Sequence, residues 1–247
     1  MVPRLLIRGV TAGAVILGAE ALYAVLHPAP RQPEFDPSGV FGDPAHPPFR
    51  VAVLGDSSVH APGVAGPHEI WVNLICQRMG QGRHVTLRSF AVTGSRAEDL
   101  LRDQLEPAIA FDPDMFLVSV GANDVIHGVG IRQFEARLDE LISALTETGT
   151  LVIQSGVADV GTIPRLKPPL RNLMTRRSAR FDRVHRRVAD RYGSHVVEHR
   201  TEDPAIWYSD RGLWSPDMFH VSAAGHQRWA DSAWRTIEPL IAENESR

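Results

Sequence analysis

The stretch VAVLGDSSVH, residues 51–60, joins a short apolar run to a glycine, a carboxylate and two hydroxyl groups. Four apolar residues followed by Gly55 are typical of a buried strand that stops abruptly. Glycine, aspartate and serine are common turn formers, so a simple turn at Gly55-Asp56-Ser57 is one interpretation. The other interpretation is that the strand delivers Ser57 to its own end as a nucleophile. The tripeptide alone leaves both open.

The rest of the chain indicates which kind of sheet this strand belongs to. Continuous apolar runs alternate with helix-like segments, and this alternation predicts an α/β fold in which helices cover both faces of a parallel sheet. The strand-like runs are 50–55, 84–92, 114–121, 150–156 and 194–199, and the helix-like segments are 67–80, 95–109, 131–148, 170–192 and 222–243.

Polar groups follow the predicted strands at positions where ligands bind. Ligand sites in open α/β sheets gather beyond the carboxyl ends of the strands, so Ser57, Gly94 and Asn123 are expected at one edge of the sheet. Asp217 and His220 precede the last helix and are expected on the same rim.

These residue types suit acyl transfer. Ser57 would be the nucleophile and His220 its base, while Asp217 could fold back to hold the imidazole. The oxyanion of a tetrahedral intermediate needs fixed donors. The backbone N–H groups of Ser57 and Gly94 and the side-chain amide of Asn123 could supply them.

The order of the motifs carries a family resemblance. Four motifs follow one another over residues 50 to about 243, namely GDS, a lone glycine, GAND, and DMFH before a final helix. This pattern resembles the SGNH (GDSL-type) hydrolase superfamily. The family letters map onto Ser57, Gly94, Asn123 and His220. The resemblance implies a flavodoxin-like, three-layer αβα sandwich with a parallel five-stranded sheet. It also implies a Ser-His-Asp triad, ester substrates, and no metal or other cofactor.

Two positions depart from the family pattern. Ser58 stands where the motif name has leucine, at a position that varies within the family. The stretch SFAVTG before Gly94 lacks the asparagine often seen there, which leaves the support of the oxyanion loop open.

Other polar residues near the predicted rim have structural interpretations. Asp56 and Asp124 are expected to brace their loops by hydrogen bonds. His60 and His127 either line the pocket or lie on the plain surface. His226, inside the last helix, is expected to be structural.

Two later segments have uneven compositions. The loop 156–169 bears proline and glycine and is expected to shape the substrate pocket with Val157, Ile163 and Leu166. The stretch 165–191 holds ten basic and only two acidic residues. It is either a solvated helix face or a docking surface for anionic polymer or lipid headgroups.

The N-terminal part of the chain differs from the rest. Residues 9–26 are mostly apolar with one charge, Glu20, and come after two arginines, which predicts a membrane anchor within 1–26 and export of the remainder of the chain. Cleavage as a signal peptide is the alternative. Residues 27–49 are rich in proline and predict a semi-extended spacer before a hydrolase domain at 50–247. The expected location is extracytoplasmic, either anchored to the cell membrane or secreted after cleavage.

Composition limits the function classes. A chain of 247 residues with 43% apolar and 22% charged residues suits one globular domain, and its net charge of −3 gives no sign of nucleic-acid binding. The single cysteine, Cys76, excludes an internal disulfide. The sequence therefore predicts an exported, membrane-tethered serine esterase for short-chain, lipid or carbohydrate-linked acyl esters. The alternatives are acyl transfer to a sugar hydroxyl and a catalytically silent binding module, and the oligomeric state stays open.

Overall fold

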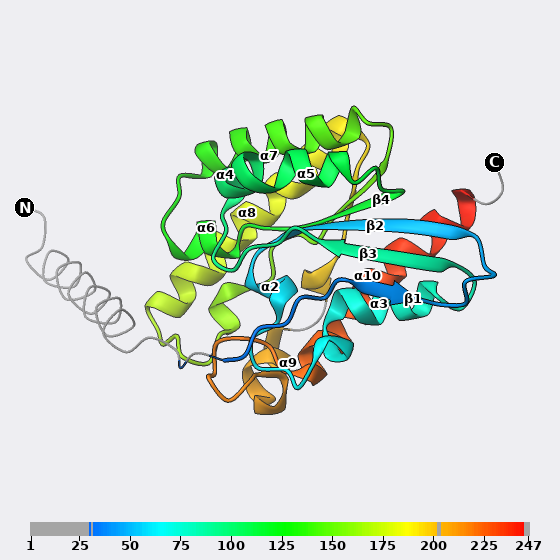
Figure 1. Cartoon of the computed structure of the whole chain (residues 1–247). Helices are drawn as coiled ribbons and strands as arrows, with labels where there is room; N and C mark the ends of the chain where they lie inside the picture. Colours follow the sequence, from blue (N-terminus) through cyan, green and yellow to red (C-terminus); the bar gives the residue numbers. More distant parts are fainter. Residues whose placement is uncertain (1–29, 31, 202–203, 245–247) are drawn as a thin grey trace, which may run out of the picture.

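The fold is organised around one mixed sheet (Figure 1). The computed structural model describes residues 30, 32–201 and 204–244. Within them, six strands pair in the order β1-β3-β2-β4-β5-β6, and β1 is antiparallel to β3 while the other pairs are parallel. The strands are β1 (Gly39–Phe41), β2 (Pro48–Gly55), β3 (His84–Ser89), β4 (Met115–Ser119), β5 (Leu151–Gln154) and β6 (His195–Val196).

β2 and β4 form the centre of the sheet. Their register pairs Val51 with Met115 and Gly55 with Ser119, so both strands end at the same level. Every residue from Val51 to Gly55 and from Met115 to Ser119 is buried, because helices cover both faces. The polar residues that come after the two strands therefore begin side by side at the carboxyl edge.

Helices cover the sheet in two layers, one on each side (Figure 1). Successive side chains of β2 point to opposite faces of the sheet. Ala52 and Leu54 pack into the apolar cluster on one face, and Val51 and Val53 pack into the cluster on the other. The first cluster includes residues of α4 (Ala97–Asp99), α5 (Leu105–Ala110), α7 (Ile131–Thr146) and α8 (Leu170–Tyr192), and the second includes residues of α3 (Trp71–Met79) and α10 (Ala223–Asn244). The predicted three-layer αβα sandwich with five parallel strands is confirmed, and β1 adds a sixth, antiparallel strand.

The predicted helix 95–109 is divided into three pieces. α4 passes into a π-helical turn, η2 (Leu100–Gln104), and only then into α5. Gln104 at the end of this turn is buried, and its amide contacts the end of β2. Single π turns inside helices frequently occur at functional sites.

Short helices occupy several connections. α2 (Ser57–His60) begins directly after β2, and α6 (Ala122–Ile126) comes after β4. These two and α9 (Pro204–Ser209) are too short to show a 3.6-residue apolar period in the sequence. The remaining turns are η1 (Pro67–Glu69), η3 (Val160–Thr162), η4 (His199–Thr201) and η5 (Arg211–Leu213).

The segment predicted as a spacer is partly packed onto the sheet. β1 pairs with the outer edge of β3, and Phe35 packs against the cluster on the α3 side. The Asn73 amide donates to the Pro37 carbonyl at 2.9 Å. The expectation of an unpacked spacer is therefore wrong for residues 35–41. The physical reason is that the edge of β3 offers unpaired backbone groups, which the proline-free residues 38–43 can reach.

The predicted anchor or signal peptide, residues 1–26, lies outside the described residues, so it stays a prediction. Among the residues that the structure describes, none of the helices has the length and apolar character of a membrane span.

Candidate active site

Ser57 is the first residue of α2, directly after the end of β2. Asp56 caps this helix by accepting a hydrogen bond from the Ser58 N–H at 2.9 Å, as an N-cap aspartate does. Gly55 packs so closely that a Cβ there would lie 2.8 Å from the Ser119 carbonyl oxygen. These contacts fix the turn from strand to helix, and Ser57 lines a pocket at this edge of the sheet.

Asp217 and His220 form a closely bonded pair. The imidazole Nδ1 donates to Asp217 Oδ2 at 2.7 Å. The other carboxylate oxygen accepts from the Ser215 hydroxyl at 2.6 Å and from the backbone N–H groups of Phe219 at 2.8 Å and His220 at 2.9 Å. Burial alone would raise the pKa of Asp217, but these hydrogen bonds outweigh it and hold the pKa well below its ordinary value. Asp217 is therefore a carboxylate at neutral pH, and His220 keeps Nε2 for chemistry.

Asn123 connects the loops that come after three neighbouring strands. Its amide nitrogen donates to Asp56 Oδ2 at 3.0 Å and to the Ser95 carbonyl at 3.2 Å, and the residue lines the same pocket as Ser57. Gly94 precedes Ser95 in a turn closed by a hydrogen bond from the Ser95 N–H to the Val92 carbonyl. Its φ of 85° lies in the region that favours glycine. The loops after β2, β3 and β4 thus meet as the sequence predicts, with both amide protons of Asn123 already bonded.

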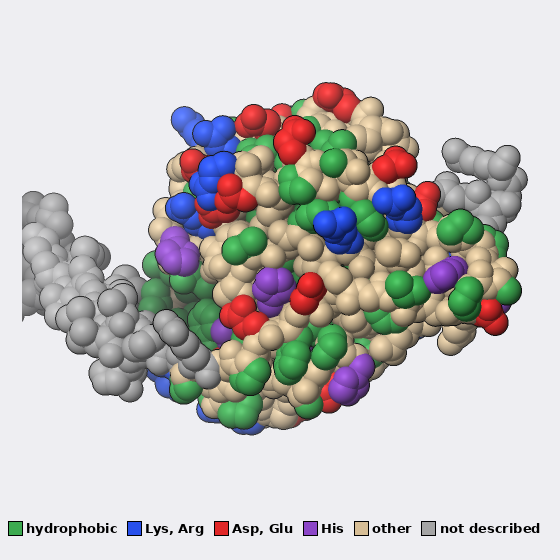
Figure 2. Space-filling view, in the orientation of Figure 1, with side chains coloured by type: hydrophobic (Ala, Val, Ile, Leu, Met, Phe, Trp, Pro, Cys, Tyr) green, Lys and Arg blue, Asp and Glu red, His purple; other side chains and the backbone are tan. Residues whose placement is uncertain are grey.

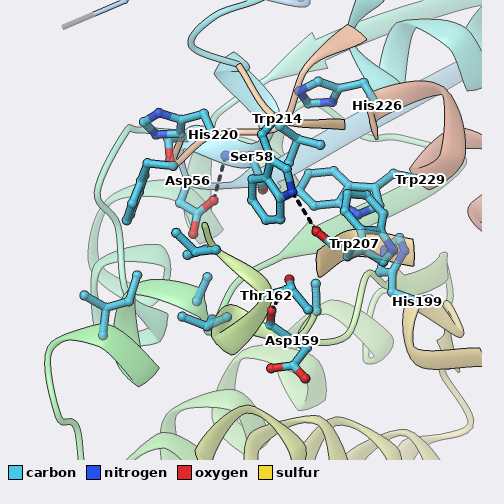
Figure 3. Close-up of a pocket in the computed structure, with 18 of the residues that line it drawn as sticks. Asp56, Ser58, Asp159, Thr162, His199, Trp207, Trp214, His220, His226 and Trp229 are labelled. Carbon is cyan, nitrogen blue, oxygen red and sulfur yellow. Dashed lines mark hydrogen bonds between the residues drawn. The ribbon is translucent and has the colours of Figure 1, made fainter. Parts of the chain in front are cut away.

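One pocket of about 150 Å³ joins most of the predicted groups. Ser57, Asn123 and His220 line it, and Asp217 bonds His220 through Nδ1. Figure 3 shows His220 and Asp56 at one end of the pocket and His199 at the other. Gly94 does not belong to the pocket lining, so its part in an oxyanion hole remains a prediction.

Tryptophans that the sequence analysis did not select form much of the wall. Trp207, Trp214 and Trp229 line the pocket, and the Trp214 indole donates to the Trp207 carbonyl at 2.9 Å (Figure 3). They come from α9, the turn after η5, and α10, so no local sequence pattern relates them. The three tryptophans give the pocket a large apolar wall beside its polar groups.

The loop 156–169 contributes to this wall as predicted. Its residues from 158 to 163, including Val160 and Ile163, line the pocket apart from Gly161. Val157 instead borders a smaller cavity of about 50 Å³ that adjoins Ser58. Leu166 packs against the core and lines neither cavity.

The model of the GDSL-like Lipase/Acylhydrolase family matches residues 53–228. The chain belongs to this family. A GDSL-like esterase, Rv1075c of Mycobacterium tuberculosis (strain ATCC 25618 / H37Rv), is 25% identical over 203 residues, which are 79% of this chain and 64% of that protein. The chain thus spans somewhat less than two thirds of this relative. Family and relative both support the predicted enzyme class, a carboxylic ester hydrolase.

Solved structures share the fold. TesA superimposes with a TM-score of 0.63 at 23% identity, over 77% of this chain and 99% of TesA. The esterase EstA from Pseudoalteromonas sp. gives 0.61 at 16% identity, over 78% of this chain and 99% of EstA. A catalytic mutant of Axe2, an acetylxylan esterase from Geobacillus stearothermophilus, gives 0.60 at 18% identity, over 77% and 94% of the two chains. The αβα fold of this GDSL-like chain is therefore shared with known esterases.

Two buried side chains brace the loops of the GDSL-like site. Gln104 accepts from the Gly55 N–H at 2.8 Å and donates to the Gly55 carbonyl at 3.0 Å and to the Ser95 hydroxyl at 3.1 Å. Asp124 accepts from the Ala97 N–H at 3.2 Å, as the bracing prediction requires. Burial raises the pKa of Asp124 to about 6, against the opposing effect of that N–H and other donors. Gln104 was not predicted because its two bonds to the Gly55 backbone join residues that are 49 positions apart in the sequence.

The structure decides between the two alternatives for the histidines near the rim. His60 lies by Thr93, with its Nδ1 3.3 Å from the threonine hydroxyl, and His127 lies by the Asn123 carbonyl at 2.8 Å. Neither lines the pocket, so the surface alternative holds for both. His226 is 1% exposed, as a structural residue would be, but it also lines the pocket.

Much of the basic charge in 165–191 is used within the molecule. Arg186 pairs with Asp182 at 3.1 Å and with Glu198, and Arg187 pairs with Glu135 of α7 at 2.9 Å. Arg177 donates to the Val125 carbonyl at 3.0 Å. On the face shown in Figure 2, basic and acidic side chains are interspersed over the upper helical layer. These pairs favour a structural explanation of the stretch over a docking surface.

Within the described ranges, no group of three or more His, Cys, Asp or Glu side chains is arranged to hold a metal ion.

Proposed function

We propose that the chain hydrolyses carboxylic esters in two steps at Ser57. The observation that carries this proposal is the Asp217–His220 pair at 2.7 Å, because His220 lines the same pocket as Ser57. A serine hydroxyl is a weak nucleophile without a base. An imidazole oriented by a carboxylate can take the hydroxyl proton, and the carboxylate then stabilises the imidazolium.

The first step makes an acyl-enzyme. The Ser57 oxygen attacks the ester carbonyl carbon while His220 Nε2 takes the hydroxyl proton. The bond to the alcohol then breaks, and His220 returns this proton to the leaving alcohol oxygen. In the second step, His220 takes a proton from water, and the water oxygen attacks the acyl carbon. Collapse of this intermediate releases the carboxylic acid and restores the proton to Ser57.

The negative charge on the carbonyl oxygen needs donors in both steps. The proposed donors are the backbone N–H groups of Ser57 and Gly94 and the amide of Asn123. Asn123 already bonds Asp56 and Ser95, so donation to the oxyanion requires it to share or release one of these protons.

Labelling and turnover test the proposal on the full-length chain. A fluorophosphonate probe is expected to form one adduct, which mass spectrometry locates on Ser57, and p-nitrophenyl acetate is expected to be hydrolysed. Absence of both would favour the silent binding module. One structural relative is an acetylxylan esterase, so acetylated carbohydrates belong in the substrate panel beside lysophospholipids. An acylated sugar formed from an added acceptor would indicate transfer rather than hydrolysis.

We further propose that the chain is exported and tethered to the membrane by residues 9–26, on the strength of their apolar composition and basic flank. The protein is then expected to stay with the membrane after a carbonate wash. Mass spectrometry that finds a mature N-terminus near Leu22 would instead establish a cleaved signal peptide.

A further inference from the structure

The pocket beside Ser57 contains more polar groups than ester hydrolysis uses. Among the described residues, seven buried side-chain nitrogen or oxygen atoms have no hydrogen-bond partner. Four of these atoms belong to residues that line this pocket, namely Asp159 Oδ2, His199 Nδ1, Arg200 Nη1 and His226 Nδ1. Buried polar atoms are rarely left unpaired, and each exception needs an explanation. Their concentration at one pocket indicates a ligand with several polar groups of its own.

His226 lies near Trp214 and Trp229, on the side of the pocket away from Asp159 (Figure 3). Burial lowers the pKa of His226 to about 3, and the neighbouring His220 acts in the same direction. The imidazole is therefore neutral at neutral pH and offers one donor and one acceptor. Its ring meets the Trp229 ring edge to face at 5.4 Å, and its Nδ1 has no partner.

The other unpaired atoms lie toward the opposite end. His199 bonds the Ser155 hydroxyl through Nε2 at 2.9 Å, which leaves its Nδ1 free. Asp159 Oδ2 and Arg200 Nη2 form an ion pair at 3.7 Å, a distance too long for a hydrogen bond. Asp159 Oδ2 and the other terminal nitrogen, Arg200 Nη1, therefore each lack a hydrogen-bond partner.

The space between these groups is aromatic and small. The Trp207 ring lies 5.8 Å from Trp214 and 6.3 Å from Trp229, measured between ring centroids. A cavity of about 150 Å³ is of the size that holds a single six-membered ring. An alkyl chain in this pocket would leave all four polar atoms unpaired.

We propose that this pocket binds a sugar ring, so that the esters cleaved at Ser57 are acyl groups carried on a pyranose. A pyranose has C–H faces, which suit the electron-rich faces of the tryptophans. Its hydroxyl groups lie around the ring edge. There they can form hydrogen bonds with the four unpaired atoms, which belong to His226, His199, Asp159 and Arg200. The inference rests on the proposed esterase function and names its substrate class.

The test compares two acetates of the same shape on the full-length chain. Methyl 6-O-acetyl-α-D-glucopyranoside carries ring hydroxyls, and cyclohexylmethyl acetate lacks them. The kcat/KM of the sugar ester is expected to exceed that of the carbocycle by about 100-fold or more, because a site with polar groups to satisfy rejects the analogue without them. His226→Phe keeps a ring of similar size and removes both nitrogens. It is expected to lower this ratio at least about tenfold.

Controls separate this inference from the esterase proposal. His185→Gln alters another buried histidine, outside the pocket, and is expected to keep the ratio. Should His226→Phe fold poorly, Trp207→Leu is expected to lower the ratio instead. Methyl α-D-glucopyranoside is expected to change tryptophan fluorescence in the wild type and less so in either pocket variant. A ratio near one with hydrolysis of p-nitrophenyl acetate would overturn the inference alone. Loss of all ester hydrolysis, with sugar binding retained, would overturn the esterase proposal alone.

Discussion

Asp217 orients His220 through a turn of four residues. Met218 has a φ of 55°, which reverses the chain so that two backbone N–H groups reach one carboxylate oxygen. The second oxygen is then free to bond the imidazole. Because these donors keep the pKa of Asp217 low in spite of burial, the carboxylate stays charged over the range in which His220 must act as a base.

Replacing Ser57 by alanine tests the nucleophile. Ser57→Ala is expected to lower kcat/KM for p-nitrophenyl acetate by at least about 1000-fold, since loss of a triad member removes acyl-enzyme formation. The melting temperature is expected to change by no more than a few degrees, because the helix cap comes from Asp56. Ser58→Ala is the matched control, and turnover by a folded Ser57→Ala protein would exclude Ser57 as the nucleophile.

Replacing Asn123 by alanine tests whether its amide stabilises the oxyanion or only holds the loops together. If its amide donates to the oxyanion, Asn123→Ala lowers kcat by about 100- to 1000-fold and leaves KM nearly unchanged. The melting temperature is also expected to fall, because Asp56 and the Ser95 carbonyl lose a donor. A loss of stability with less than a tenfold change in kcat would show that Asn123 only holds the loops together.

At the scale of single elements, the π turn η2 connects the helical layer to the nucleophile strand. It places Gln104 against both backbone groups of Gly55, at the end of β2. The same amide bonds Ser95, so one side chain links the end of β2 to the loop after β3. This link provides the loop support that the missing asparagine before Gly94 left open.

Gln104→Ala is expected to destabilise the protein and to slow it. The Gly55 N–H would be buried without an acceptor, at a loss of about 1–3 kcal/mol, while the Gly55 carbonyl would keep its bond from the Val92 N–H. A lower melting temperature and a lower kcat are expected together, measured by thermal unfolding and by p-nitrophenyl acetate turnover. Gln133→Ala, at an exposed position of α7, is the matched control. An unchanged kcat in Gln104→Ala would mean that the nucleophile turn is held without Gln104.

Elements were predictable where their pattern is periodic and local. The long helices α7 and α8 carry their apolar spacing in the sequence, and the predicted segments overlap them closely. The five parallel strands were also predicted, although the last, predicted over 194–199, contains only two residues in β6. β1 was missed because its pairing depends on the open edge of β3 rather than on its own residues. Ser57 and His220 were found because motifs mark them. Trp207 and Gln104 were missed because only the folded chain brings them to their partners.

At the scale of the whole molecule, three histidines with lowered pKa values give a common response to acid. Burial lowers the pKa of His185 and His199 to about 4 and that of His226 to about 3. In the unfolded chain these groups titrate near 6.5. Below pH 6.5 the unfolded state therefore binds protons that the folded state does not, and the free energy of unfolding falls as pH decreases. Asp124 opposes this trend, because its raised pKa of about 6 lets the folded state take a proton first.

His185 provides the cleanest test, since it is fully buried away from the pocket, between Gln154 and the Val120 carbonyl. Its contribution is complete above pH 6.5 and is lost progressively toward pH 4. His185→Gln removes the titrating group, so its free energy of unfolding is expected to fall less steeply over pH 7 to 4.5, by about 1 kcal/mol per pH unit. Urea unfolding across this range measures the slope, with the exposed His68→Gln as control. An identical slope in wild type and His185→Gln would mean that His185 is not held neutral by burial, because Asp124 contributes equally to both proteins.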